Sequence, residues 1–584
     1  MYTKNPFLYF DFKQFAHQGT PLAFSDPVDV LIANQHDDVI PCLQQIIKKV
    51  SAGYYAAGYL SYEAAPAFNP SYQAHEQHEL PLLWFGIFRE PIEISDDYWQ
   101  EHSFSISEWQ PNIAFTEYTD HVRKIKEYIH RHVTEQVNYT VRLTSKFSGD
   151  TFSFFKQLAK TQAANYHAYL NIEPYSILSV SPELFFHIKD QHITTRPMKG
   201  TIHRGKTYEE DLMLAKWLQS SDKNQQENKL ITNLMIEELS NIAEPNTIKV
   251  ENQFSLEKYP TLYQMTSTIK ARLSANIDLI DVFQALFPNG SITGIPKQNT
   301  MKLIKQLEHQ PREVFSGAIG YITPAEEAIF NVPIRTVIVN NKTEQAVYGV
   351  GGAITKQSNA KEEFQEIMTK AKLLTTPWPT FKLLETFGLI DGKYLVFENH
   401  LNRLKQSARY FNYPINEDKI RQALIDTAKQ YSKHKWKVRL LLDEKGQFSI
   451  STEEIEQQPT EIIVALADHP IDKNNIFHYH KTTYRNMYEQ VGSKNTRNDI
   501  SDWILWNENR EVTEFTQGNI VIKMNGKLFT PPVACGLLPG TFREELIKKK
   551  IINEQNISID DLHRCEQIWF INSVREWIPV KIVD

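Results

Sequence analysis

The sequence predicts an α+β protein with one large domain followed by a smaller one. The chain has 584 residues, which is too long for a single core at roughly 100–200 residues per domain. Its 41% hydrophobic and 23% charged residues are typical of a chain that folds into packed cores. The segment Leu374–Thr380, LTTPWPT, has two prolines that interrupt a helical pattern. We therefore expect a domain over residues 1–375, a linker over 376–380 and a second domain over 381–584.

The first domain mixes strands with amphipathic helices. Apolar residues at helical spacing predict a helix that carries Val122, Ile125, Ile129 and Val133. The apolar runs Tyr175–Val180 and Val332–Val339 are typical of buried strands. Because no second break is as plain as the first, we expect one large unit with many strands.

The second domain shows the same mixture at a smaller scale. Trp436–Leu442 and Ile462–Ala467 are short strand-like runs between helical patterns. They predict a second α+β domain.

Composition excludes several classes of function. The net charge of −7 argues against nucleic-acid binding. The three cysteines, Cys42, Cys535 and Cys565, lie far apart without a CxxC motif, which argues against a disulfide framework and a cysteine-based zinc site. The first residues lack the apolar stretch of a signal peptide, and no run of about 18 apolar residues could span a membrane. We expect a cytoplasmic protein without membrane contact.

A lysine follows the predicted strand His192–Arg196. Arg196-Pro-Met-Lys199-Gly-Thr201 places Lys199 between a proline and a glycine, where the backbone turns. Such a lysine is usually solvated. It can instead act as a nucleophile when burial or another cation lowers its pKa.

Four further segments carry chemical groups. Glu183 lies in the apolar stretch Ser181–Phe185, SPELF. GSITGIPK at Gly290–Lys297 is a turn rich in glycine and hydroxyl groups, and Phe315–Tyr321, FSGAIGY, has small residues that allow close packing. Tyr348–Ala353, YGVGGA, is expected to end a strand with N–H groups suited to an anion before an acidic helix begins. It is not a dinucleotide fingerprint, since GxGxxG is missing.

In this order the segments resemble the signature blocks of the chorismate-utilising enzymes, from about Gly58 to Lys372. The blocks are PMKGT, SPELF, GSITGIPK, SGAIGY, FNVPIRT and GVGGAI. The resemblance implies an α/β-sandwich fold. Anthranilate synthases typically carry alanine where this chain has Lys199, whereas aminodeoxychorismate synthase component I carries lysine. The resemblance therefore points to the second group, with an anthranilate synthase-like activity as an alternative.

The resemblance also implies roles for individual residues. Lys199 would attack the chorismate ring, with Glu183 as the general acid–base that helps the ring hydroxyl leave. Mg²⁺, a hard cation, would be held by Glu227 and Glu366, with Glu363 one turn before Glu366 holding a metal-bound water. The substrate-binding residues would be Arg335, Lys370, Gly351, Gly352 and Thr293.

The chain departs from the family pattern in two places. The block after Glu227 places Asn233 where an acidic residue is usual and Ile236-Glu237-Glu238 where Arg-Asn-Asp is usual. Gln264 stands where a histidine is frequent, and it cannot carry a proton. No cysteine lies in a glutaminase-type elbow, so we expect the chain to use free ammonia or a separate glutamine amidotransferase subunit.

The second domain resembles the fold type IV pyridoxal-phosphate enzymes from about Phe381 onwards. The similar segments are LET at Leu384–Thr386, FENHLNRL at Phe397–Leu404, HKTTYRN at His480–Asn486 and TEFTQGN at Thr513–Asn519. The resemblance implies a domain of two subdomains and a dimer through this part of the chain. It also implies that Lys481 carries pyridoxal 5′-phosphate, that Glu514 holds the pyridinium proton, and that Arg403, Gly540 and Thr541 bind the phosphate.

The order of the two domains favours one reaction sequence. Amination of chorismate would give 4-amino-4-deoxychorismate, from which the second domain would expel pyruvate to leave p-aminobenzoate for folate synthesis. A D- or branched-chain amino-acid transaminase as the second domain is an alternative. A further alternative is a domain that binds chorismate without turnover and serves as a scaffold.

Overall fold

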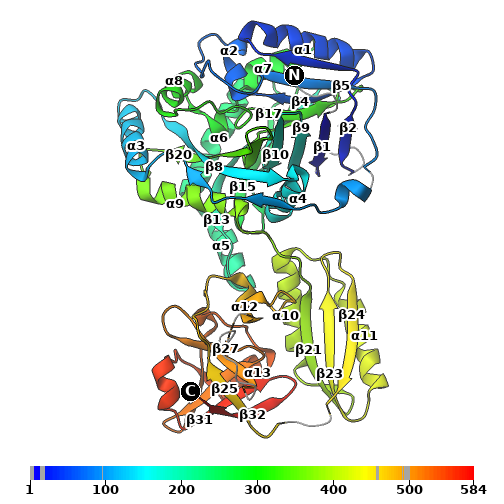
Figure 1. Ribbon diagram of the computed structural model, residues 1–584, viewed down its shortest axis with the longest axis vertical. Coiled ribbons are helices and arrows are strands. Elements are labelled where there is room, and N and C mark those ends of the chain that lie inside the picture. The colour runs from blue at the N-terminus through cyan, green and yellow to red at the C-terminus, as the bar shows by residue number, and fades with distance from the viewer. Residues whose placement is uncertain are drawn as a thin grey trace. The chain divides into compact units, whose positions relative to one another are not determined.

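The computed structural model describes residues 6–13, 20–94, 96–455, 459–489, 491 and 500–583 (Figure 1). The chain forms two compact units. The first comprises residues 1–203 and 215–378, and the second comprises residues 204–214 and 379–584. Both combine helices with sheets, so the α+β prediction is confirmed. The segment Arg204–Leu214 belongs to the second unit, although it lies within the sequence of the first. A single domain boundary near residue 375 does not include this segment in the second domain.

The first unit contains two ten-stranded sheets whose pairings are all antiparallel. The first sheet has the order β16 (Gly294–Ile295), β8 (Gln136–Gly149), β20 (Gln345–Ile354), β19 (Thr336–Asn340), β10 (Tyr175–Ser181), β9 (Tyr166–Asn171), β1 (Phe7–Phe12) and β2 (Leu22–Ser25), with β6 (Phe104–Ile106) and β7 (Gln110–Pro111) on β8.

The second sheet carries Lys199, which lies within the strand Met198–His203 and not in a turn as predicted. Its order is β13 (Met198–His203), β15 (Leu262–Arg272), β12 (His192–Arg196), β11 (Leu184–Lys189), β18 (Ala328–Asn331), β17 (Ala318–Ile322), β4 (Tyr55–Leu60), β5 (Leu83–Phe88) and β3 (Asp29–Ala33), with β14 (Lys249–Lys258) on β15. The register of β13 on β15 shifts between Met198 and Thr201, so the strand is irregular at Lys199.

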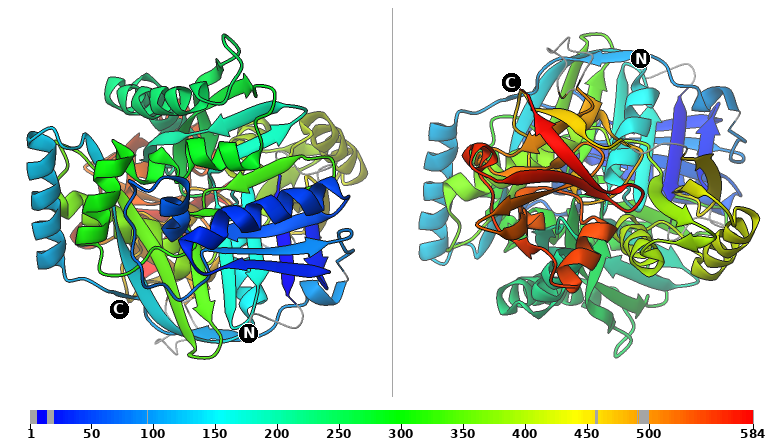
Figure 2. Two further views of the ribbon diagram at one scale, coloured as in Figure 1. Left: turned by 90° about the horizontal axis from the view of Figure 1, so that it is seen from above. Right: turned by 90° about the horizontal axis from the view of Figure 1, so that it is seen from below.

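The two sheets pack face to face, as the sandwich prediction requires. Phe10 of β1 meets Tyr321 of β17 with ring centroids 5.4 Å apart, inside a buried cluster drawn from both sheets. Helices cover the outer faces: α1 (His36–Ser51), α2 (Ala65–Phe68), α6 (Asp222–Ser240) and α7 (Leu279–Leu286) on the second sheet, and α3 (Phe115–His130), α4 (Thr151–Gln162), α8 (Lys297–Leu307) and α9 (Ala360–Ala371) on the first. Figure 2 shows α1, in blue, lying along strands of the second sheet.

The predicted elements are found with shifted ends. The apolar stripe forms α3, which buries Val122 and Ile125 but ends at His130, before Val133. The run Tyr175–Val180 forms β10. The strand predicted at Val332 begins only at Thr336, because Pro333 offers no N–H group and Arg335 has a left-handed backbone with φ of 53°.

The second unit has two subdomains. The first is a four-stranded sheet with helices α10 (Phe397–Phe411) and α11 (Glu417–Gln430), in the strand order β22 (Lys393–Tyr394), β21 (Leu383–Ile390), β23 (Lys435–Leu442) and β24 (Phe448–Glu454). The second is an eight-stranded mixed sheet with α12 (Asn486–Glu489) and α13 (Thr541–Lys548), in the order β27 (Val512–Phe515), β26 (Asp502–Trp506), β25 (Ile462–Leu466), β32 (Glu576–Ile582), β31 (Gln567–Asn572), β28 (Asn519–Met524), β29 (Lys527–Thr530) and β30 (Asn553–Glu554).

Buried polar contacts hold the segment Arg204–Leu214 in the second unit. The Arg204 guanidinium donates to both oxygens of Asp211, at 2.6 and 2.8 Å, and to the carbonyl oxygen of Tyr410 at 2.9 Å. The Tyr410 hydroxyl donates to the carbonyl oxygen of Gly205 at 2.7 Å. The His480 ring bonds to the carbonyl of Lys206 at 3.1 Å. The segment, which leads into α5 (Tyr208–Ser220), therefore braces α10 and the residue next to Lys481.

Candidate active sites

The first unit has a cavity of about 360 Å³, within the size range of small-molecule sites. Nine of the ten site residues predicted for this unit line it: Glu183, Lys199, Glu227, Arg335, Gly351, Gly352, Glu363, Glu366 and Lys370. They come from both sheets and from helices α6 and α9. Residues up to about 190 positions apart in the sequence thus meet in one place.

Lys199 is partly buried at the irregular part of β13. Asn228 donates to its carbonyl oxygen at 3.2 Å, and Gln264 donates to the carbonyl oxygen of Gly200 at 3.1 Å, which holds this irregular part of the strand in place. Burial lowers the pKa of the Lys199 amine, and the nearby Lys370 lowers it further, while Glu227 opposes the shift. A larger share of the amine is therefore neutral and nucleophilic at neutral pH.

Glu183 is buried beside Lys199 in the cavity wall. Ser291 Oγ donates to Glu183 Oε1 at 2.5 Å, and the backbone N–H of Glu183 donates to Ser181 Oγ at 3.1 Å. Burial raises the pKa of Glu183 to about 7, against the lowering effects of Ser291 and Lys199. A carboxyl group with this pKa can both give and take a proton at neutral pH.

Three glutamates from two helices face the same cavity. Glu227 lies on α6, and Glu363 and Glu366 lie one turn apart on α9. Burial raises the pKa of Glu363, whereas the ion pair with Lys370, at 2.8 Å, lowers the pKa of Glu366. An all-oxygen donor set suits a hard cation such as Mg²⁺. Within the described residues, the ligand oxygens of these three carboxylates do not all lie within 4.8 Å of one another.

The substrate-binding candidates lie around the edge of β20. Lys370 Nζ donates to the carbonyl oxygen of Gly351 at 3.0 Å. A side chain at Gly351 would place its Cβ 2.3 Å from the carbonyl oxygen of Tyr139, so only glycine fits. The segment Tyr348–Ala353 forms the end of β20, as predicted, but Gly351 and Gly352 are still paired with β8 there. Burial lowers the pKa of Arg335, which also lines the cavity.

Thr293 is the predicted residue that the structure does not bring to the cavity. Its side chain is fully buried, and its hydroxyl donates to the carbonyl oxygen of Asn289 at 3.0 Å. It stabilises the GSITG turn, whose Ser291 and Ile292 do line the cavity. Its contribution to the site is therefore indirect.

The second unit has a cavity of about 450 Å³ that brings together all five residues predicted for it: Arg403, Lys481, Glu514, Gly540 and Thr541. Burial lowers the pKa of Lys481 to about 8, and the nearby Arg403 adds to this effect. The amine is thus closer to its neutral form than a solvated lysine.

Glu514, on β27, is a buried acid in the wall of the second cavity. The Tyr488 hydroxyl donates to Glu514 Oε1 at 3.1 Å, and Asn519 Nδ2 lies 3.4 Å from the other oxygen. Burial raises the pKa of Glu514 to about 8. A cationic pyridinium N–H placed here would supply the charge that stabilises the ionised carboxylate, which fits pyridoxal 5′-phosphate.

The other end of the second cavity is suited to a phosphate. Gly540 and Thr541 lie at the N-terminus of α13, where free N–H groups favour an anion. A Cβ at Gly540 would lie 1.8 Å from Asn519 Oδ1, so this approach requires glycine. Arg403 is held by two hydrogen bonds to Glu385, at 2.9 and 2.7 Å, which orient its guanidinium.

Comparison with known proteins decides the family. The model for chorismate binding enzymes matches residues 5–376, and the model for class IV amino-transferases matches residues 382–583. The chain belongs to the chorismate binding enzyme family. Its second part is a class IV amino-transferase domain, a family that uses pyridoxal phosphate. Within the described residues, no helix is long and apolar enough to cross a bilayer.

Individual relatives of this chorismate binding enzyme agree with the assignment. Aminodeoxychorismate synthase component 1 of Salmonella typhimurium is 35% identical over 272 residues, which cover 46% of this chain and 59% of that protein. The Escherichia coli protein of the same name is 35% identical over 299 residues, covering 51% and 66%. The chain thus spans less than two thirds of the length of these relatives. The crystal structure of anthranilate synthase component I from Streptococcus pneumoniae shares the fold, with a TM-score of 0.52 at 22% identity, covering 64% of this chain and 91% of that one.

The residues of the altered block of this family member have structural positions outside the cavity. Asn233 and Glu237 are exposed on α6, away from the cavity. Glu238 instead forms a buried ion pair with Lys297 at 2.7 Å, and Lys297 also donates to the carbonyl oxygen of Leu286 at 2.9 Å. The block therefore anchors α6 to the GSITGIPK turn.

Sequence reasoning missed several basic residues of the second cavity: Lys437, Arg439, Arg485 and Arg575. Lys437 and Arg439 alternate along β23, so they share the face that lines the cavity. That alternation in WKVRLLL was a usable signal. Ser291, which bonds to Glu183, was also missed as an individual residue because serine in a turn has many structural uses.

Proposed function

We propose that the first unit aminates chorismate with ammonia to 4-amino-4-deoxychorismate and that the second unit converts this product to p-aminobenzoate and pyruvate. The observation that carries the proposal is Lys199, a lysine of lowered pKa in one cavity with Glu183 and three glutamates. The printed names of the Salmonella and Escherichia relatives, aminodeoxychorismate synthase component 1, support it.

Lys199 acts as the nucleophile in the first reaction. Its neutral Nζ attacks the ring carbon next to the carboxylate-bearing one, and the ring hydroxyl leaves. Glu183, protonated in part at neutral pH, gives the proton with which the hydroxyl departs as water. Ammonia then displaces Lys199, and the excess proton passes to solvent or to Glu183. The balance is one ammonia consumed and one water released.

The other residues of the first cavity hold the substrate. Glu227, Glu363 and Glu366 would hold Mg²⁺, which supplies positive charge for the ring carboxylate. Arg335 and Lys370 provide further cationic donors for the two carboxylates of chorismate.

The second cavity supports elimination of pyruvate. Pyridoxal 5′-phosphate, when bound, supplies an electron sink conjugated with the substrate nitrogen. Lys481 would hold the cofactor and carry a proton from the ring carbon that bears the nitrogen. Glu514 would keep the proton on the cofactor's ring nitrogen, and Arg403 with the N-terminus of α13, which line the same cavity, would bind its phosphate. The basic residues Lys437, Arg439 and Arg575 suit a substrate with two carboxylates.

The source of ammonia belongs to the same proposal. The name component 1 of the relatives supports a separate glutamine amidotransferase partner, which this chain would need when ammonia is scarce. A dimer through the second unit stays an expectation from resemblance, and a location in the cytoplasm stays an expectation from the sequence.

Product analysis of the purified chain tests the proposal. The chain is given chorismate, Mg²⁺ and ammonium, with and without pyridoxal phosphate, and the products are separated by chromatography. We expect p-aminobenzoate and pyruvate in equal amounts with the cofactor, and 4-amino-4-deoxychorismate without it. Anthranilate as the product would contradict the role of Lys199, and amino-group transfer to a 2-oxo acid would favour a transaminase. No aromatic amine and no consumption of chorismate would favour a scaffold.

A further inference from the structure

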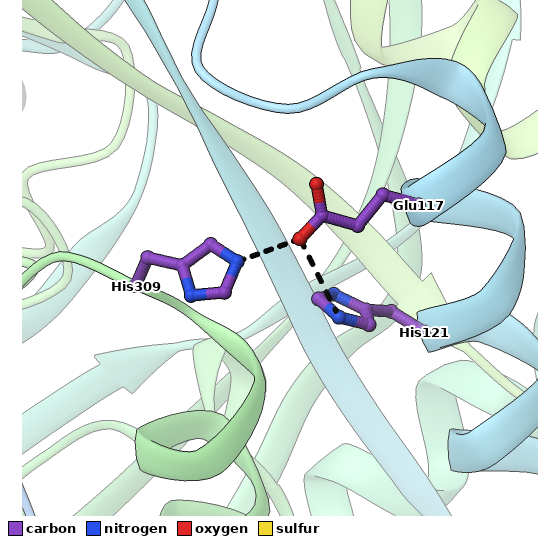
Figure 3. A group of neighbouring side chains, drawn as sticks. All are labelled: Glu117, His121 and His309. Atoms are coloured by element: carbon purple, nitrogen blue, oxygen red, sulfur yellow. Dashed lines mark hydrogen bonds and ion pairs between the residues drawn. The ribbon is translucent and has the colours of Figure 1, made fainter.

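A cluster of metal-ligand side chains lies outside both cavities. Glu117 and His121 are one turn apart on α3, and His309 follows α8 (Figure 3). One ligand atom from each lies within 4.8 Å of the other two. His309 Nε2 is 2.7 Å from Glu117 Oε1, and His121 Nε2 is 4.0 Å from the same oxygen. None of the three lines the cavity that contains Lys199.

His121 is oriented as metal-binding histidines are. Its side chain is buried, and its Nδ1 forms a hydrogen bond of 2.6 Å with the Tyr139 hydroxyl. Metal-ligating histidines commonly use the second ring nitrogen in such a bond, which fixes the ring and leaves the other nitrogen for the ion. Burial lowers the pKa of His121, which favours the neutral form that binds a metal ion.

The geometry needs only small adjustments to close around an ion. Ligands at about 2.0–2.1 Å from a tetrahedral zinc lie about 3.3 Å from one another. His309 and Glu117 would separate by roughly 0.6 Å, and Glu117 and His121 would approach by roughly 0.7 Å. The side chains of Glu117 and His309 are 43% and 59% exposed, so both are free to move this far.

The chemistry of the ligands selects the ion. Two imidazoles and one carboxylate are a frequent three-residue set for zinc, with a fourth position left for water or another ligand. Imidazole nitrogen is a poor ligand for Mg²⁺, which prefers the oxygen donors of Glu227, Glu363 and Glu366. An exposed Glu117–His309 ion pair alone would contribute little to the stability of the fold, and it would not account for the orientation of His121.

We propose that Glu117, His121 and His309 bind a divalent transition-metal ion, zinc by preference, at a site outside both cavities. The ion ties α3 to the segment after α8. Because Tyr118 of α3 packs on Phe364 of α9 with ring centroids 5.1 Å apart, the site also braces the helix that carries Glu363.

Cobalt, a spectroscopic substitute for zinc, tests the site directly in the full chain. Co²⁺ is titrated into the metal-free protein with Mg²⁺ in large excess, and the visible absorption of nitrogen-ligated, tetrahedral Co²⁺ is recorded. Zinc affinity is then measured by competition. The variants are His309→Ala, Tyr139→Phe and, as a matched control, His130→Ala, an exposed histidine at the end of the same helix.

We expect one equivalent of Co²⁺ with an intense visible band that zinc displaces and that His130→Ala retains. His309→Ala should weaken binding at least about tenfold and remove the band, and Tyr139→Phe should weaken it about tenfold. Absence of the band in the wild-type chain would overturn the proposal. Binding unchanged in His309→Ala would also overturn it, because the ion would then lie elsewhere, for instance on the glutamates of the first cavity.

Discussion

Removing the hydroxyl of Ser291 should raise the pKa of Glu183 and move the pH dependence of amination. Ser291 Oγ donates to the buried Glu183 carboxylate at 2.5 Å, a bond that favours the ionised form. A hydrogen bond to a charged group contributes about 1.5–3 kcal/mol. Since one pKa unit corresponds to about 1.4 kcal/mol, Ser291→Ala should raise the pKa by about one to two units.

The sign of the effect follows from the role of Glu183 as an acid. Its protonated form gives the proton to the leaving hydroxyl, so amination should decline as pH rises through its pKa. The alkaline limb of the wild-type profile should lie near pH 7, since the pKa of Glu183 is about 7. In Ser291→Ala the limb should lie about one to two pH units higher.

Chorismate consumption without pyridoxal phosphate isolates the first reaction. Total ammonium is adjusted at each pH so that the concentration of free ammonia stays constant. Ser291→Thr, which keeps a hydroxyl, and Ser316→Ala are the controls. Ser316 lines the same cavity, and its hydroxyl has no hydrogen-bond partner within the described residues. An alkaline limb at the same pH in Ser291→Ala and wild type would refute the assignment of that limb to Glu183.

Three further predictions concern the second unit. Glu514→Gln should lower the rate of p-aminobenzoate formation about 10- to 100-fold and leave the rate of chorismate consumption unchanged, because a charge-assisted hydrogen bond to the cofactor is lost. An equal loss of the two rates would contradict this. Asp211→Asn should lower the free energy of unfolding of the second unit in urea by about 3–5 kcal/mol, because the buried Arg204 loses its charged partner. A decrease of less than about 1 kcal/mol would show that this ion pair is not buried in solution. Burial alone would raise the pKa of Glu385, but Arg403 and His400 lower it to about 2. The ionised Glu385 should therefore contribute about 3 kcal/mol to the free energy of unfolding above pH 5, and this contribution should be lost as the pH falls toward 2. Glu385→Gln should remove this acid dependence in unfolding measured at each pH, and an unchanged dependence would exclude Glu385 as its source.

Local patterns made much of this structure predictable. The apolar stripe of α3 and the apolar run that forms β10 are made of residues close together in the sequence. The spacing of apolar residues was therefore enough to predict both elements. The residues that meet in each cavity were predicted from the resemblance of the blocks around Lys199 and Lys481 to two known families, not from local periodicity.

The features that were not predicted depend on distant contacts. Arg204 bonds to the carbonyl of Tyr410, 206 positions away, and no local pattern marks the segment Arg204–Leu214 as part of the second unit. His309 reaches Glu117 across 192 positions. The late start of β19 depends on the left-handed backbone of Arg335, a conformation uncommon for this residue type and visible only in the folded chain.

Two lysine variants assayed side by side test the central claim that successive reactions use separate cavities of one chain. Each is given chorismate, ammonium, Mg²⁺ and pyridoxal phosphate, and the aminated intermediate and p-aminobenzoate are quantified. Lys481→Ala should accumulate 4-amino-4-deoxychorismate without p-aminobenzoate, and Lys199→Ala should leave chorismate unchanged. Formation of p-aminobenzoate at the wild-type rate by either variant would contradict the account.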